Sequence, residues 1–383
     1  MKYYLIAGEP SGDALGAKLM QALKAKDKKA EFAGIGGDSM QAAGLKSLFD
    51  ISDLAIMGLA EVIPSIPKIL HRINETIADI QKYQPDAVIS IDSWSFCARI
   101  HKKLRKLKLN IPQIHYVAPQ VWAWKKKRAR TMYKYIDHLL TLFPQEPKYF
   151  TPYNLPATFV GHPVIESEVV NGKKGGFKKR HKIQDESRLM LVLPGSRHNE
   201  VERLLPVFLQ VVKNIHTKYN DFAFAIPTVS TVAPRVKKAV EESGLPIIVV
   251  EGQKERHDAF KEATVAIAAS GTVALELAIV DVPHIIAYKV PKLTEWVVRH
   301  FIHIQFVNLS NILLGREVVP ELLQNDCTEE KIEYYVEQFV KHKDIYNRQM
   351  KGFEDVRKIL GMGKQTPSEN AAKTIINLIK RKK

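Results

Sequence analysis

Near its start the sequence reads Tyr3-Tyr4-Leu5-Ile6-Ala7-Gly8-Glu9-Pro10-Ser11-Gly12-Asp13. The first five residues are apolar and predict a buried strand, and the glycine-rich loop leads into a helical pattern from Ala14. A strand, a tight loop and a helix direct backbone N–H groups at a bound ligand. Asp13 is predicted to cap that helix. A second glycine loop at 34–38 follows the next strand, so the N-terminal half is expected to be a ligand-binding α/β unit.

Short apolar runs alternate with helical patterns along the whole chain. This alternation predicts an α/β fold of two Rossmann-like halves, each with a parallel sheet covered by helices on both faces. The predicted strands are 3–7, 32–34, 87–91, 113–117, 138–142, 158–160, 189–193, 222–226, 247–250, 265–268 and 284–287. Helices are predicted at 69–83 and 98–107, and the polar, glycine-rich segment 172–180 is predicted to be a linker or exposed loop.

Length and charge narrow the class of protein. The 383 residues predict two domains, and the net charge of +16 suits a polyanionic partner such as nucleic acid, an anionic bilayer or a phosphorylated substrate. For any single basic cluster, a solvated face that aids solubility is the preferred explanation. The apolar run at the start is too short for a signal peptide, and no run is long enough to span a bilayer. Cys97 and Cys327 are expected to be reduced, and no His/Cys cluster predicts a metal.

Two loops of the second half predict a diphosphate site. Leu193-Pro194-Gly195-Ser196-Arg197 and Ala269-Ser270-Gly271-Thr272 each join a predicted strand to a helix. Arg197 offers a two-pronged donor for phosphate, and Glu276, one turn into its helix, could accept hydrogen bonds from ribose hydroxyls. Taken singly, each loop is more simply a capped turn.

A carboxylate ends the third predicted strand. Asp92 follows Ile91 directly, where the carboxyl end of a parallel strand meets a ligand cleft, so it is the candidate general base. A helix cap is the equally supported alternative. His115 and His162 are further base candidates, but a structural hydrogen-bonding role is preferred for both.

Two apolar segments suggest contact with a membrane surface. Segment 57–72 is apolar up to Lys68 and Arg72, and its Pro64 and Pro67 make it a poor regular strand or helix. An apolar lip bordered by cations suits a bilayer interface, and the alternative is that these apolar side chains belong to the core. Segment 121–128 has Trp122 and Trp124 followed by cations, a pattern that also fits a core aromatic pair beside a basic helix.

These segments, in this order, resemble the lipid-A-disaccharide synthase family, glycosyltransferase family 19. The resemblance rests on 8–13, 34–37, 57–62, 91–93, 118–124, 161–163, 193–197, 270–276 and 308–324. It implies a GT-B fold, with two Rossmann-like domains facing across a cleft. Their expected bounds are 1–165 for the acceptor and membrane-facing domain, 166–355 for the UDP-sugar domain, and 356–383 for a C-terminal helix that returns to the first domain.

The resemblance also implies a reaction and its site. The family transfers 2,3-diacylglucosamine from its UDP conjugate to 2,3-diacylglucosamine 1-phosphate, with inversion, and releases UDP and the β-1,6-linked lipid A disaccharide 1-phosphate. Asp92 matches the proposed base. The implied donor-binding residues are Ser196, Arg197, Ser270, Gly271, Thr272, Glu276 and Asn311. The implied acceptor-side residues are Gly8, Glu9, Ser11, Gly12, Asp13, Gly36, Gly37, Met57 and Glu61, and the membrane-facing ones are Val62, Ile63, Ile66, Ile69 and Leu70.

One motif departs from the family. After Asp92 the family usually has a small residue and then Pro-Asp-Phe-Asn, whereas this chain has Ser93-Trp94-Ser95-Phe96-Cys97. No cofactor, metal or nucleic acid is expected, because UDP-sugar is a substrate and a D-x-D motif is absent from the sequence. The expected partners are the two acylated sugars and an anionic inner-membrane surface, which the protein would meet from the cytoplasmic side.

Three other functions are compatible with parts of the sequence. Another GT-B enzyme, such as a UDP-sugar epimerase or a transferase with a soluble acceptor, would share the phosphate loops. A basic nucleic-acid-binding protein finds local support in the tryptophans and lysines of 122–127. An NAD-dependent oxidoreductase is disfavoured, because Ser39 stands where G-x-G-x-x-G needs its last glycine.

Overall fold

The computed structural model describes residues 1–54, 59–121, 126–291, 295 and 305–382, with the backbone alone for 59–65 and Lys126. The chain divides into two units. Unit 1 contains Met1–Pro163 and Gly363–Lys383, and unit 2 contains Val164–Met362.

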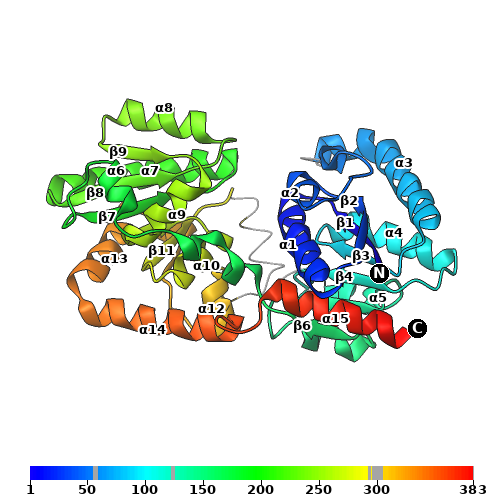
Figure 1. Cartoon of the computed structure of the whole chain (residues 1–383). Helices are drawn as coiled ribbons and strands as arrows, with labels where there is room; N and C mark the ends of the chain where they lie inside the picture. Colours follow the sequence, from blue (N-terminus) through cyan, green and yellow to red (C-terminus); the bar gives the residue numbers. More distant parts are fainter. Residues whose placement is uncertain (55–58, 122–125, 292–294, 296–304, 383) are drawn as a thin grey trace. The chain divides into compact units, whose positions relative to one another are not determined.

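Unit 1 has a parallel sheet in the order β2-β1-β3-β4-β5-β6 (Figure 1). Its strands are β1 Lys2–Ala7, β2 Glu31–Ile35, β3 Ala87–Ile91, β4 Gln113–Tyr116, β5 His138–Thr141 and β6 Ala157–Phe159. Alternate residues of β1 enter two different cores: Tyr3 and Leu5 pack on one face of the sheet, Tyr4 and Ile6 on the other. β1 is therefore buried on both faces, as the sequence predicted for a strand covered by helices on both sides.

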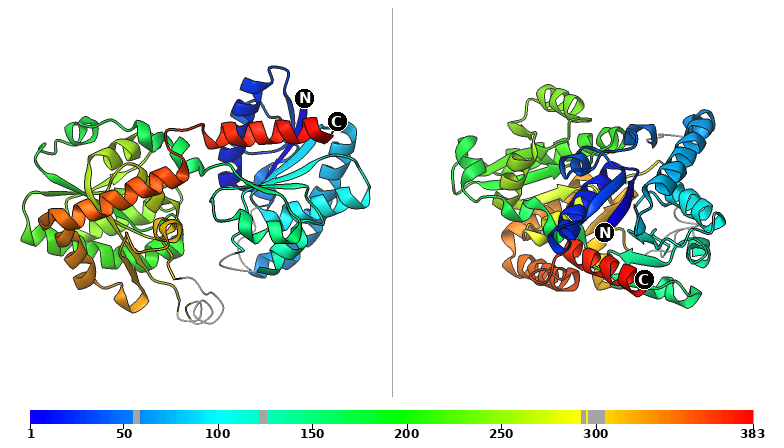
Figure 2. Two further views of the ribbon diagram at one scale, coloured as in Figure 1. Left: turned by 90° about the horizontal axis from the view of Figure 1, so that it is seen from below. Right: turned by 45° about the vertical axis from the view of Figure 1, so that its right-hand side comes forward.

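The helices of unit 1 cover both faces of this sheet. They are α1 Pro10–Lys26, α2 Asp38–Ala42, α3 Leu59–Tyr83, α4 Trp94–Lys106, α5 Ala129–Met132 and α15 Pro367–Lys382. α15 packs against α1, and Ala371 and Ile375 are buried in the same core as Leu19 (Figure 2). α3 and α4 pack together over the opposite face, with Ile73 and Ile100 buried there.

Two predictions about the first loop were wrong. α1 begins at Pro10, not Ala14, because proline at the start of a helix lacks only an N–H that has no helical partner there. Gly12 is needed inside this first turn, since a Cβ would lie 3.0 Å from the carbonyl oxygen of Ile91. Asp13 does not cap α1. It accepts hydrogen bonds from the backbone N–H groups of Gly37, Ser39 and Met40, so it ties the first glycine loop to the start of α2.

The prolines of segment 57–72 do not prevent a helix. α3 runs from Leu59 through Pro64 and Pro67 to Tyr83. Each proline removes one helical hydrogen bond, but the turns after Pro67 contain no further proline and bury Ile73, Ile77 and Ile80. Tertiary packing of this apolar stripe outweighs the local proline cost.

Unit 2 repeats the arrangement with a parallel sheet in the order β12-β11-β10-β7-β8-β9. Its strands are β7 Arg188–Leu193, β8 Phe222–Pro227, β9 Ile247–Val250, β10 Ala263–Ala268, β11 His284–Tyr288 and β12 Glu321–Leu323. Its described helices are α6 Gly176–Arg180, α7 His198–Lys218, α8 Ala233–Ser243, α9 Gln253–Glu262, α10 Thr272–Ile279, α12 Leu309–Leu314, α13 Glu329–Lys341 and α14 Lys343–Leu360.

Segment 172–180 is part of unit 2 rather than a linker. Its residues 176–180 form α6, which packs against α9, and the Phe177 side chain is fully buried. The Glu262 carboxylate accepts hydrogen bonds from the backbone N–H groups of Phe177 and Lys178. The composition of this segment is typical of a loop, but the buried Phe177 ring and the Glu262 carboxylate fix part of it as a helix.

Candidate functional site

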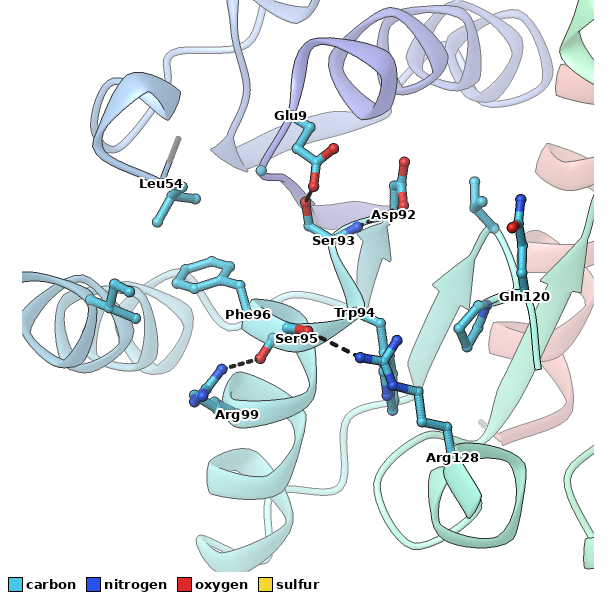
Figure 3. Close-up of a pocket in the computed structure, with 14 residues that line it drawn as sticks. Glu9, Leu54, Asp92, Ser93, Trp94, Ser95, Phe96, Arg99, Gln120 and Arg128 are labelled. Atoms are coloured by element: carbon cyan, nitrogen blue, oxygen red, sulfur yellow. Dashed lines mark hydrogen bonds between the residues drawn. The ribbon is translucent and has the colours of Figure 1, made fainter. Parts of the chain in front are cut away.

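Unit 1 contains a cavity of about 650 Å³ at the carboxyl ends of β1, β3 and β4 (Figure 3). This is the edge of a parallel sheet where ligands bind. The cavity is lined by Gly8, Glu9, Leu54, Ile69, Asp92, Ser93, Trp94, Ser95, Phe96, Arg99, Val117, Pro119, Gln120 and Arg128.

Asp92 lies in this cavity on a strained turn. Its φ is 55° and that of Ser93 is 42°, so two consecutive residues with side chains adopt the left-handed conformation. Such residues cost on the order of 1–2 kcal/mol each and cluster at functional sites. The carboxylate accepts hydrogen bonds from the Ser93 N–H at 2.9 Å and the Ser11 hydroxyl at 3.2 Å. The turn therefore holds the carboxylate at the cavity wall.

The predicted acceptor-side residues divide into two groups. Gly8 and Glu9 line the cavity, and the Ser93 hydroxyl donates to Glu9 at 2.7 Å. The second group does not line the cavity and instead holds the glycine loops in place; its members are Gly12, Asp13, Gly36 and Gly37. The Gly36 N–H, for example, donates to the Ser47 hydroxyl. Met57 and the side chain of Glu61 lie outside the described residues.

The alternative bases and the nearby thiol are enclosed in the protein. His115 is fully buried and hydrogen-bonds the Ser90 hydroxyl, and burial places its pKa well below the usual value. Burial lowers the pKa of His162 to about 3 and raises that of the Cys97 thiol to about 12. At neutral pH these groups are uncharged and shielded from a ligand, in agreement with the structural role preferred for the histidines.

Among the cavity residues that were not identified from the sequence as site residues are Trp94, Arg99 and Arg128. Trp94 lies over His115 with ring centroids 4.7 Å apart, and so forms one wall. Arg99 extends from α4, and Arg128 stands just before α5. Both guanidinium groups point toward Ser95 (Figure 3). Arg99 follows Ser95 by one helical turn, so the spacing could have indicated the contact of Arg99 with Ser95, but not the approach of Arg128.

Unit 2 contains a second cavity, of about 830 Å³, between the loops that end β7 and β10. Most predicted donor residues line it, namely Ser196, Arg197, Ser270, Gly271, Thr272 and Glu276. Gly271 has φ 134° at the start of α10, a conformation that favours glycine. The two loops that sequence analysis paired as a diphosphate site thus meet in one cavity.

Glu200 already occupies the first of these helix N-termini. Its carboxylate accepts hydrogen bonds from the backbone N–H groups of Ser196 and Arg197 at 3.2 and 3.3 Å, and it pairs with the Arg197 guanidinium at 2.9 Å. Gly195 makes room, since a Cβ there would lie 2.4 Å from Glu200 Oε2. The Arg197 side chain remains 79% exposed and is held toward the cavity by this pair.

Glu276 has a partner that the sequence did not indicate. It forms an ion pair with Arg256 of α9, and both residues line the cavity. Asn311, by contrast, is fully buried and lies outside the cavity lining. Its amide nitrogen donates to Val319 and Glu321, and its amide oxygen accepts from the Val318 and Val319 N–H groups. Asn311 therefore orders the chain before β12 rather than facing a ligand.

The predicted membrane-facing residues are split by the structure. The side chains of Ile66 and Leu70 are 45% and 51% exposed, whereas Ile69 packs on the core and lines the unit 1 cavity. The side chains of Val62 and Ile63, and Trp122 and Trp124, lie outside the described residues. No helix within the described ranges is long and apolar enough to cross a membrane.

Comparison with known proteins gives consistent matches over nearly the whole chain. A sequence profile of the lipid-A-disaccharide synthetase family matches residues 3–375. The chain is 45% identical to the lipid-A-disaccharide synthase of Rhodospirillum centenum over 377 residues, which is 98% of this chain and 94% of that protein. It is also 45% identical to that of Paramagnetospirillum magneticum over 386 residues, covering 100% and 99% of the two chains.

Solved structures share the fold at low identity. UDP-GlcNAc 2-epimerase from Neisseria meningitidis, bound to UDP-GlcNAc, superposes with a TM-score of 0.64 at 15% identity over 100% of both chains. MurG from Acinetobacter baumannii superposes with a TM-score of 0.55 at 15% identity over 99% of both chains. The chain has two parallel sheets, each covered by helices, and it superposes on these two enzymes. Together these findings confirm the predicted GT-B fold.

Proposed function

The chain belongs to the lipid-A-disaccharide synthase family, and from this premise we propose how its two cavities divide the work of forming the lipid A disaccharide. The unit 1 cavity binds the acceptor, 2,3-diacylglucosamine 1-phosphate. The unit 2 cavity binds the UDP of the donor, UDP-2,3-diacylglucosamine. The observation that carries this assignment is Asp92, a carboxylate held on a strained turn at the wall of the unit 1 cavity.

In this proposal Asp92 acts as the general base. Its carboxylate takes the proton of the acceptor's 6-hydroxyl as that oxygen attacks C1 of the donor sugar. The attack comes from the face opposite UDP and inverts C1. The Ser93 N–H and the Ser11 hydroxyl orient the carboxylate. The neutral, buried His115 takes no part in proton transfer.

The leaving diphosphate requires positive charge in unit 2. Arg197 supplies an exposed guanidinium, and the N-terminus of α10 at Thr272 supplies partial positive charge. Glu200 holds the Arg197 guanidinium in place. It also accepts the hydrogen bonds of the Ser196 and Arg197 N–H groups at the start of α7, so these groups are not available to the ligand. Glu276 remains the proposed ribose contact, oriented by its ion pair with Arg256.

We also place a membrane-docking surface along α3 and α4. Asn74 of α3 accepts a hydrogen bond from Lys103 of α4. Leu70 and Ile66 lie one and two turns before Asn74, on the same face of α3, and both are exposed. α4 contributes the exposed Lys102, Lys103 and Lys106 to this surface. Apolar side chains next to cations suit the surface of an anionic bilayer.

UDP release from UDP-2,3-diacylglucosamine, measured with and without 2,3-diacylglucosamine 1-phosphate, tests the division of work. We expect release only when the acceptor is present, together with an acylated disaccharide product detected by mass spectrometry. Release without acceptor would indicate hydrolysis or epimerase-like chemistry and would contradict the proposal.

A further inference from the structure

Two cations of the unit 1 cavity have no part in the chemistry described so far. Arg99 donates to the backbone carbonyl of Ser95, and Arg128 approaches the Ser95 hydroxyl at 3.5 Å. Their guanidinium groups converge on Ser95 from two elements, α4 and the turn before α5 (Figure 3). The contact of Arg128 with the Ser95 hydroxyl is weak, because 3.5 Å is long for a hydrogen bond and the hydroxyl is neutral. Most of the N–H donors of Arg128 are therefore available to another acceptor.

Neither arginine is neutralised within the described part of the chain. No described carboxylate forms an ion pair with Arg99 or Arg128, whereas Arg72, Arg197 and Arg256 each have at least one such partner. The acidic residues of the cavity, Glu9 and Asp92, lie on the other side of Ser93 and Ser95 (Figure 3). The cavity thus has an acidic end and a basic end.

We propose that Arg99 and Arg128 bind the phosphate of a sugar 1-phosphate acceptor. This inference rests on the proposed function, in which Asp92 receives the proton of the acceptor's 6-hydroxyl. In a hexopyranose the 1-phosphate and the C6 hydroxymethyl group stand on C1 and C5, on either side of the ring oxygen, and point away from each other. A phosphate on the two arginines therefore leaves the 6-hydroxyl free to turn toward Asp92, and excludes the reversed orientation, in which phosphate would face Glu9 and Asp92.

Guanidinium groups suit this task for a geometric reason. Each can donate two parallel N–H groups to phosphate oxygens, so the pair fixes both the position and the orientation of the phosphate. Trp94 and Phe96, between the acidic and basic residues in sequence, supply apolar wall for the sugar ring. The arginines are accordingly specificity-determining residues, and the proton transfer itself does not involve them.

Phosphorus NMR titration of the intact protein with glucosamine 1-phosphate tests the inference without donor or acyl chains. We expect Arg128→Gln and Arg99→Gln each to weaken binding by roughly 10- to 100-fold, the usual worth of a charge-assisted hydrogen bond. Arg128→Lys should fall between Gln and wild type. Arg130→Gln is the matched control, since Arg130 is an exposed neighbour that contacts Tyr153 outside the cavity. Inorganic phosphate is titrated in parallel. Glucosamine, which contains no phosphorus, is followed by its displacement of glucosamine 1-phosphate, and we expect both to bind more weakly than glucosamine 1-phosphate.

The outcomes separate this inference from the proposed function. Unchanged glucosamine 1-phosphate binding in both folded Gln variants would overturn it, as would equal losses in Arg130→Gln. Equal binding of glucosamine and its 1-phosphate by the wild type would also overturn it, even if the transferase assay succeeds. If the phosphate-specific binding is lost in the variants but no disaccharide forms in the wild type, the site stands and the assigned reaction falls. Circular dichroism confirms that each variant is folded, and the two arginines provide independent variants.

Discussion

Replacing Asp92 by Asn removes the proposed base while keeping the turn that holds it. Asparagine tolerates the left-handed conformation at φ 55°, and its amide oxygen can still accept the Ser93 N–H bond of 2.9 Å. We therefore expect the free energy of unfolding to change by less than about 1 kcal/mol. Asp92→Ala is the poorer choice, because alanine would add roughly 1–2 kcal/mol of backbone strain.

Turnover should fall much further than stability. General bases contribute roughly 10²–10⁴-fold to rate, which corresponds to about 3–5 kcal/mol in the activation barrier. We expect Asp92→Asn to lose that much kcat in the UDP-release assay, with UDP affinity by calorimetry unchanged, because Asp92 does not line the unit 2 cavity. Asp50→Asn is the control, since this exposed carboxylate caps a turn away from the cavity. A folded Asp92→Asn variant with near wild-type turnover would refute the assignment and make Glu9 the next candidate.

Four other predictions follow from the described contacts. Glu276→Ala should weaken UDP binding about 10-fold in calorimetry while pyrophosphate affinity is kept or increased, because Arg256 then loses its carboxylate partner; equal losses for both ligands would contradict the ribose role. Changing both Ile66 and Leu70 to Ser should leave the protein folded but release it from anionic vesicles at high salt in a sedimentation assay. Activity should persist in excess chelator after gel filtration, and loss that Mg²⁺ restores would show that an ion neutralises the leaving group. Burial lowers the pKa of His101 from 6.5 to about 4, so between these pH values the unfolded chain takes up a proton there and the folded chain does not. The free energy of unfolding should therefore fall by on the order of 3 kcal/mol as the pH falls from 6.5 toward 4, and the full stability is present above pH 6.5. Urea unfolding across this pH range measures the loss.

The strands were largely predictable because a strand buried on both faces is an uninterrupted apolar run. β3, predicted as 87–91, has those bounds in the structure. β12 was missed, since Glu321–Leu323 has three residues and begins with a carboxylate. α3 was misjudged because its prolines are a local signal, whereas the packing of Ile73 and Ile77 is a tertiary one.

Site residues were predictable where they adjoin a strand end, and not where partners come from distant segments. Asp92 and the loop of Ser270 and Gly271 belong to the first kind. The ion pair of Glu276 with Arg256 and the convergence of Arg99 and Arg128 belong to the second. Chain topology brings these side chains together, and no spacing in the sequence records it.

The position of α15 in unit 1 imposes an order on folding during synthesis. Residues 164–362 form unit 2 as one continuous segment, so it has all its parts once Met362 has left the ribosome. Unit 1 must wait for α15, whose Ala371 and Ile375 cover the apolar side of Leu19 in α1. The half of the protein that is made first is therefore completed last, and until then it exposes an apolar surface. A nascent chain that ends before α15 should need protection from aggregation although every other element of unit 1 has been made.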